Sequence, residues 1–85
     1  MWYTVAKSEI VMHDGVRVIA GSVWSAKAFS VNGCAMVELT NVDEAAEVGI
    51  MNLVKTSAQD FFTKPTRSLD DAMENSFMIA ERVYC

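Results

Sequence analysis

The chain has 85 residues, of which 52% are hydrophobic and 21% charged, which is typical of a folded globular protein and excludes a disordered one. Its formal net charge is −4 and its Lys and Arg residues are not clustered, which argues against direct binding to nucleic acid. No apolar run is long enough to span a membrane. The N-terminus does not resemble a signal peptide. We therefore expect one cytoplasmic domain over residues 1–85, mainly β in 1–40 and mainly α in 41–85.

Residues 2–12 and 16–20 are rich in the aromatic and β-branched side chains that favour strands, and Asp14-Gly15 lies near the middle of this region. A two-residue Asp-Gly loop favours a hairpin with a type I′ turn, because both loop positions need positive φ. This loop would place Val11 opposite Val18.

A second hairpin is predicted around Asn32-Gly33, again with a two-residue loop. This register puts Lys27 opposite Glu38, and such opposite-charge pairs stabilise neighbouring strands modestly.

The stretch between the hairpins, residues 20–29, allows three interpretations. Gly21-Ser22 forms a turn between strands, a bulge in one long strand, or the start of a short helical turn. We favour the strand interpretations, which give an antiparallel meander of three or four strands.

Residues 41–63 have apolar side chains at helical spacing, which predicts a first helix. Asn41 and Glu44 fit a capping box at its start. Gly49 within it suggests close packing against the sheet, and Pro65 requires the helix to end near Thr63.

The last segment, from Ser68 onward, predicts a second helix, with Ser68 and Asp71 as a capping box. Its apolar stripe is expected to face the core. That stripe comprises Leu69, Ala72, Met73, Ser76, Phe77, Ala80, Val83 and Tyr84.

Strands followed by helices predict a small two-layer α+β domain, in which two hairpins form the sheet and both helices pack on one face. The other face would then be open to solvent. An aromatic residue left on that face, from Trp2, Tyr3 or Trp24, would be a contact site.

The chain shows no catalytic constellation, cofactor motif or metal site. His13 belongs to a turn without a catalytic partner, and Cys34 is expected to pack in the sheet, away from the helix N-terminus or cationic neighbour that activates a thiol. The terminal Cys85 is expected to be accessible. Acids at the two helix starts complement the helix dipoles; they are Asp43, Glu44, Glu47, Asp70, Asp71 and Glu74.

These observations favour a non-enzymatic interaction module that regulates or inhibits another macromolecule. Inhibitors of host machinery encoded by bacteriophages are one class of this size. Residues 41–85 hold eight acidic and four basic residues, so a protein with a basic surface is the expected partner. The expected contact residues are Asp70, Asp71, Glu74, Met78, Glu81, Trp24 and Tyr3.

The alternative is a ligand-binding or enzymatic domain whose site forms at a homodimer interface, lined by His13, Trp24 or Tyr3. An exposed edge strand or a methionine-rich helix flank would allow two copies to pair by two-fold symmetry.

Overall fold

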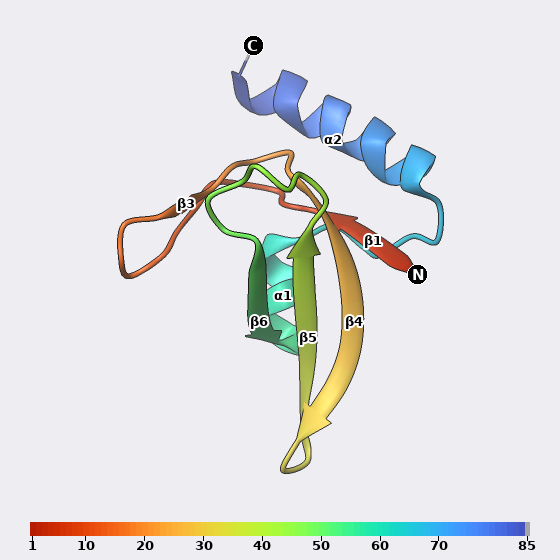
Figure 1. Cartoon of the computed structure of the whole chain (residues 1–85). Coiled ribbons are helices and arrows are strands. Elements are labelled where there is room, and N and C mark those ends of the chain that lie inside the picture. Colours follow the sequence, from red (N-terminus) through yellow and green to blue (C-terminus); the bar gives the residue numbers. More distant parts are fainter. Residues whose placement is uncertain (85) are drawn as a thin grey trace.

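The computed structural model describes residues 1–84 and has the predicted α+β architecture (Figure 1). Over these residues, a four-stranded antiparallel sheet has the order β1-β4-β5-β6, and β2 and β3 form a separate two-stranded sheet. The elements are β1 (Trp2–Val5), β2 (Ile10–Val11), β3 (Arg17–Val18), β4 (Val23–Val31), β5 (Cys34–Asn41), β6 (Ile50–Val54), α1 (Lys55–Phe61) and α2 (Leu69–Tyr84).

The hairpin of β4 and β5 confirms the register predicted from its loop. Asn32 has φ 50° and Gly33 has φ 79°, so both loop residues have the positive φ of a type I′ turn. Lys27 pairs with Glu38. The tip of this hairpin projects beyond the rest of the molecule (Figure 1).

The first hairpin, β2 and β3, differs from the prediction by one residue of register, because Val11 pairs with Arg17 instead of Val18. Its loop spans residues 13–15 and has positive φ only at Gly15. The Asp14 carboxylate accepts a hydrogen bond from the Val16 amide at 3.0 Å, which stabilises a local turn. This hairpin is an excursion between β1 and β4, which pair with each other.

The stretch that allowed three interpretations contains a turn between strands. Gly21 has φ 88°, and the Ser22 amide donates to the Ile19 carbonyl at 3.1 Å. The turn is therefore centred on Ala20-Gly21, one residue earlier than predicted, and β4 begins directly after it at Val23.

The predicted first helix is wrong over residues 41–54. Residues 42–49 form a loop, in which Asn41 Oδ1 accepts from the Asp43 amide at 2.9 Å and Asp43 Oδ1 accepts from the Ala45 amide at 3.0 Å. Residues 50–54 then form β6, whose side chains alternate between exposed and less exposed positions. Asn and Asp favour turns as readily as helix caps, and a short apolar run fits either period.

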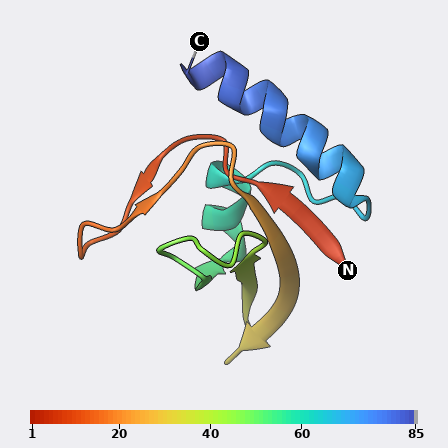
Figure 2. The ribbon, with the colours of Figure 1, turned by 45° about the horizontal axis from the view of Figure 1, so that its top comes forward.

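The two helices pack on opposite faces of the sheet, although the sequence predicted one shared face. Trp24 and Val23 are consecutive in β4 and therefore point to opposite faces. Trp24 packs edge-on against Phe62, just after α1, with ring centroids 6.1 Å apart. Val23 packs with Ala72 and Ile79 of α2. In Figure 2, β1 runs between the two helices.

The outer edge of β1 is covered by the segment that joins the helices. Isolated antiparallel bridges link Tyr3 with Thr66 and Ala6 with Phe62. Residues 61–66 therefore form a strip along β1, with α1 at one end and α2 beyond the other.

Candidate functional site

Helix α2 begins where the sequence predicted. The Asp71 amide donates to Ser68 Oγ at 3.3 Å, so Ser68 caps the helix, and Asp70 and Asp71 lie in its first turn. Acids at this position interact favourably with the helix dipole.

The helix approaches the sheet through small side chains. Ala72, Ser76 and Ala80 recur at intervals of four residues, and residues with this spacing lie on one side of a helix. Ser76 Oγ donates to the Gly21 carbonyl. A Cβ atom added at Gly21 would lie 3.4 Å from the Ala80 Cβ. The backbones of α2 and the Ala20-Gly21 turn therefore lie close together.

This orientation leaves most bulky side chains of α2, Ile79 excepted, exposed to solvent. Among the described residues of α2, only Ala72 and Ile79 are buried, whereas Phe77 is 72% exposed and Met73 53% exposed. The prediction that the whole apolar stripe is core is therefore wrong. The exposed members of that stripe are Leu69, Met73, Phe77, Val83 and Tyr84.

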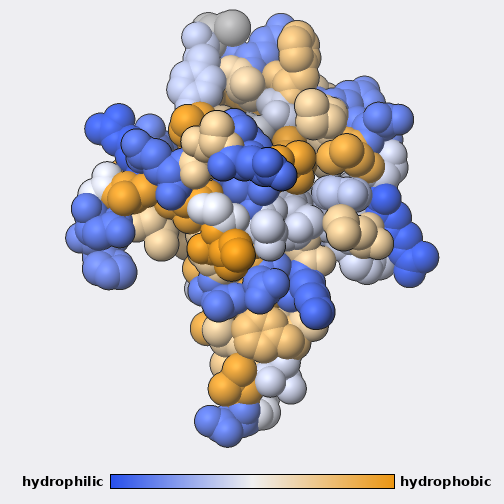
Figure 3. Space-filling view, in the orientation of Figure 1, coloured by the Kyte–Doolittle hydropathy of each residue, from blue (hydrophilic) through white to orange (hydrophobic). Residues whose placement is uncertain are grey.

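Acidic side chains lie next to the exposed apolar residues on the surface of α2. Glu74 and Glu81 lie three residues before and four residues after Phe77, so both neighbour it on the helix surface. Apolar and hydrophilic surfaces lie side by side over α2 (Figure 3). We call this surface the α2 patch; it consists of Leu69, Asp70, Met73, Glu74, Phe77 and Glu81, all exposed.

The remaining acidic and methionine contact residues predicted from the sequence also lie on the exposed side of α2. Asp71 and Met78 are exposed. Met78 lies four residues from both Glu74 and Arg82, beside the α2 patch and nearer the segment that joins the helices.

The predicted aromatic contact residues are placed differently. Trp24 is fully buried and donates its indole N–H to Ser22 Oγ at 2.9 Å, so it is a core residue and offers no contact surface. Tyr3 is half-buried and packs against the cluster beneath α2. His13 lies exposed in the β2–β3 loop. These three side chains do not meet in a common site.

Cys34 is exposed at the tip of the β4–β5 hairpin, which corrects the expectation that it packs in the sheet; Cys85 lies outside the described residues. Asp43, Glu44 and Glu47 lie in the loop before β6 instead of at a helix start. Within residues 1–84, no three His, Cys, Asp or Glu side chains are placed to hold a metal ion together.

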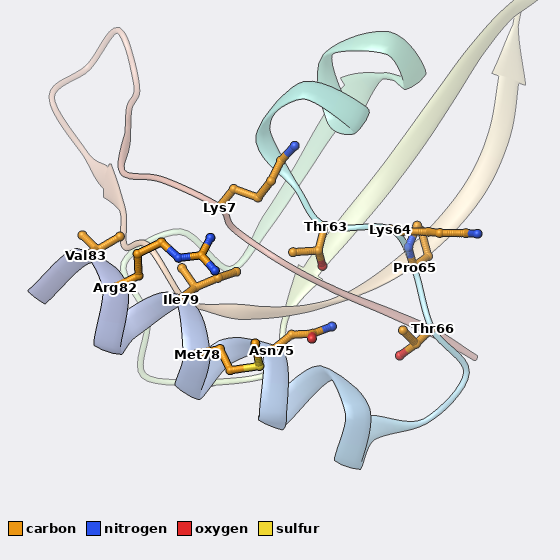
Figure 4. A pocket seen from close by; sticks show the side chains of 10 residues that line it. All are labelled: Lys7, Thr63, Lys64, Pro65, Thr66, Asn75, Met78, Ile79, Arg82 and Val83. Atoms are coloured by element: carbon orange, nitrogen blue, oxygen red, sulfur yellow. The ribbon is translucent and has the colours of Figure 1, made fainter.

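A groove of about 520 Å³ separates α2 from the segment that joins the helices. Figure 4 shows the side chains that line it. Arg82, Met78 and Ile79 come from α2, whereas Lys7 extends toward α1, away from α2. The ammonium group of Lys7 therefore lies on the α1 side of the segment that joins the helices.

The sequence pattern that indicates the orientation of α2 is the run of small residues at positions 72, 76 and 80. The predicted apolar stripe contains these three residues together with Met73 and Phe77, because hydrophobicity alone does not distinguish a helix face that packs closely from a neighbouring one that remains exposed.

Among residues 1–84, no helix has both the length and the apolar character needed to cross a membrane. Comparisons of the chain with protein-family models, curated proteins and solved structures find no match.

Proposed function

We propose that this chain is a non-enzymatic interaction module that binds, and thereby regulates or inhibits, another protein through the α2 patch. One observation carries the proposal: a large aromatic side chain, Phe77, is 72% exposed on a helix that buries only two side chains among residues 69–84. Contiguous exposed apolar surface with a polar rim is typical of protein interaction sites.

The composition of the α2 patch indicates the chemistry of the partner. An amphipathic helix typically binds by placing apolar anchors, spaced three or four residues apart, into a groove. Met73 and Phe77 have this spacing, and Asp70, Glu74 and Glu81 lie beside them. The matching surface is an apolar groove rimmed by Lys and Arg, because opposite charges favour encounter and register.

A quantitative pull-down from lysate of the cells that naturally produce the protein tests this proposal. Phe77→Ser removes the apolar anchor, and Glu74→Lys reverses a neighbouring charge. Partners that bind the α2 patch should be recovered with the wild type and lost, by tenfold or more, with Phe77→Ser, since buried aromatic anchors contribute about 2 kcal/mol or more.

Matched controls make the same types of substitution at exposed positions outside α2. Val31→Ser alters an apolar residue exposed at the β4–β5 tip, and Glu44→Lys reverses a charge in the loop before β6. Both should retain the partners. Equal recovery with Phe77→Ser and Val31→Ser would rule out the α2 patch as the binding surface.

Self-association is a second candidate, favoured by the edge of the sheet at β6. Residues 50–54 carry no charged side chain, and Ile50 is 64% exposed. Within residues 1–84, no further strand pairs with this edge. Edge strands without charges or Pro are prone to pair with another chain. A two-fold axis at Asn52 would place Ile50 opposite Val54 of a second copy.

Sedimentation velocity at two concentrations tests this candidate. Asn52→Lys would place two like charges opposite each other at the axis and should shift a dimer to monomer. Ala35→Lys, exposed in β5 near the hairpin tip, should not. A wild-type monomer at both concentrations excludes β6 pairing and leaves the α2 proposal intact.

A further inference from the structure

A second hollow lies on the opposite face of the sheet from α2. It occupies about 440 Å³, within the range of about 300 to 1,000 Å³ that is typical of small-molecule sites. One wall is the inner side of α1, with Lys55, Ala58 and Gln59, continued by Phe62 just after the helix. The strands opposite provide Ala26, Val37 and Leu39.

The space inside this pocket exists because small apolar residues face each other from the strands and from α1. Ala26 lies next to Leu39 in register, and Ala58 faces them from α1. Two alanines at facing positions leave space that larger side chains would fill. Phe62 and Leu39 are almost fully buried and form the base of the pocket.

The charged residues around this pocket are all cations. Lys7, Lys55 and Lys64 line it, and within residues 1–84 no Asp or Glu does. The Lys7 ammonium donates to the Gln59 carbonyl at 3.3 Å, which holds it beside α1, and Figure 4 shows this side chain pointing that way. This arrangement contrasts with the chain as a whole, whose net charge is −4.

We propose that this pocket binds a small ligand with an apolar body and one carboxylate. The apolar interior would receive the body, and the lysine side chains that line the pocket would attract the carboxylate. No Arg lines the pocket in the described residues; Lys acts as a point charge, whereas Arg provides the planar, bidentate contacts that often select phosphate. This proposal is independent of partner binding by α2.

Titration of the ¹⁵N-labelled protein with three probes tests the ligand class. Octanoate should shift the amide resonances of residues around Ala26, Val37 and Ala58 and saturate. 1-Octanol, which lacks the charge, and inorganic phosphate, which lacks the apolar body, should bind at least about threefold more weakly. Equal binding of 1-octanol, equal binding of phosphate, or no saturable shift with octanoate would each overturn the proposal.

Variants test the location of the site. Lys55→Gln and Lys64→Gln should each weaken octanoate binding by about two- to fivefold, the usual contribution of an exposed charge pair. Lys27→Gln, which removes a lysine outside the pocket, should leave it unchanged. If both pocket variants bind octanoate as tightly as Lys27→Gln does, the assignment fails.

Filling the pocket provides a second, independent measurement. Ala26→Leu places a larger side chain in the pocket and should reduce octanoate binding at least tenfold. Ala28→Leu adds the same volume on the same face of β4, at an exposed position that does not line the pocket, and should bind normally. Phe77→Ser should also bind normally, so failure here and failure of the α2 proposal are distinguishable. If Ala26→Leu does not fold, the lysine variants still decide.

Discussion

Gly21 lies between the sheet and α2, and two independent features of its position favour glycine. Its φ is 88°, in the region that side chains with a Cβ atom rarely adopt. An added Cβ would also lie 3.2 Å from the Ser76 carbonyl oxygen. This close approach allows the Ser76 hydroxyl to donate a hydrogen bond to the Gly21 carbonyl, and it sets the distance between α2 and β4.

Gly21→Ala should therefore destabilise the protein by about 2 to 3 kcal/mol, because it combines backbone strain with a steric conflict at α2. The matched control is Gly15→Ala. Gly15 has the same φ of 88° with no atom within 4 Å of an added Cβ, so strain alone should cost about 1 kcal/mol.

Urea unfolding curves measure both effects, provided that the slope stays constant between variants. Equal losses for Gly21→Ala and Gly15→Ala would mean that α2 does not pack closely against the turn.

Single residues also show how far the sequence determines the local structure. The Asn32-Gly33 loop was predicted in type and register, because its backbone requirement is local. The sequence predicts Trp24 as a contact residue, whereas it is a core residue whose indole N–H bonds to Ser22. Both faces of β4 are covered at its start, by Phe62 on one and by α2 on the other, and the residues adjacent to Trp24 in the sequence do not indicate this.

At the scale of elements, the end of the chain was predicted better than its middle. The Ser68 cap and the length of α2 follow from local pattern. Residues 50–54 fit both a helical stripe and strand alternation. Pairing with the edge of β5 satisfies backbone groups that would otherwise lack partners, and this long-range gain favours the strand.

The strand assignment of β6 makes a prediction for amide hydrogen exchange. The Asn41 amide donates to the Gly49 carbonyl at 2.7 Å. Since bonded positions alternate in an antiparallel ladder, Met51 and Leu53 should bond to β5, whereas Ile50 and Asn52 should point outward. In monomeric protein, the amides of Met51 and Leu53 should exchange at least tenfold more slowly than those of Ile50 and Asn52.

NMR-detected exchange in D₂O at low protein concentration makes this measurement. The amides of Leu39 and Val37, which pair with Met51 and Leu53, provide the reference for protected positions. Uniform protection across residues 50–54 would contradict the edge-strand assignment and support the helical alternative.

At the scale of the whole molecule, the sheet separates two groups of buried side chains. One contains Trp24, Leu39 and Phe62 on the α1 face, and the other contains Val5, Val23 and the two buried residues of α2. The sequence predicted the fold class but not this separation, because hydrophobic periodicity identifies the buried positions of an element without identifying the neighbour that buries them.

This separation predicts that α2 opens without unfolding of the sheet. Among residues 69–84, only Ala72 and Ile79 are buried, whereas β4 and β5 pair along most of their length. Segments with few buried contacts open at lower free energy than the core. Native-state hydrogen exchange in increasing urea should therefore give the amides of central α2 a free energy of opening at least about 1 kcal/mol below that of Leu39, with a smaller urea dependence.

Equal free energies and equal urea dependences would show that α2 and the sheet unfold as one unit. The predicted difference has the same origin as the proposed interaction surface. Packing through Ala72, Ser76 and Ala80 allows close approach but buries little apolar area, and it leaves Phe77 and Met73 in solvent. A partner that covers these side chains should therefore raise the free energy of opening of α2, because it binds only the closed helix.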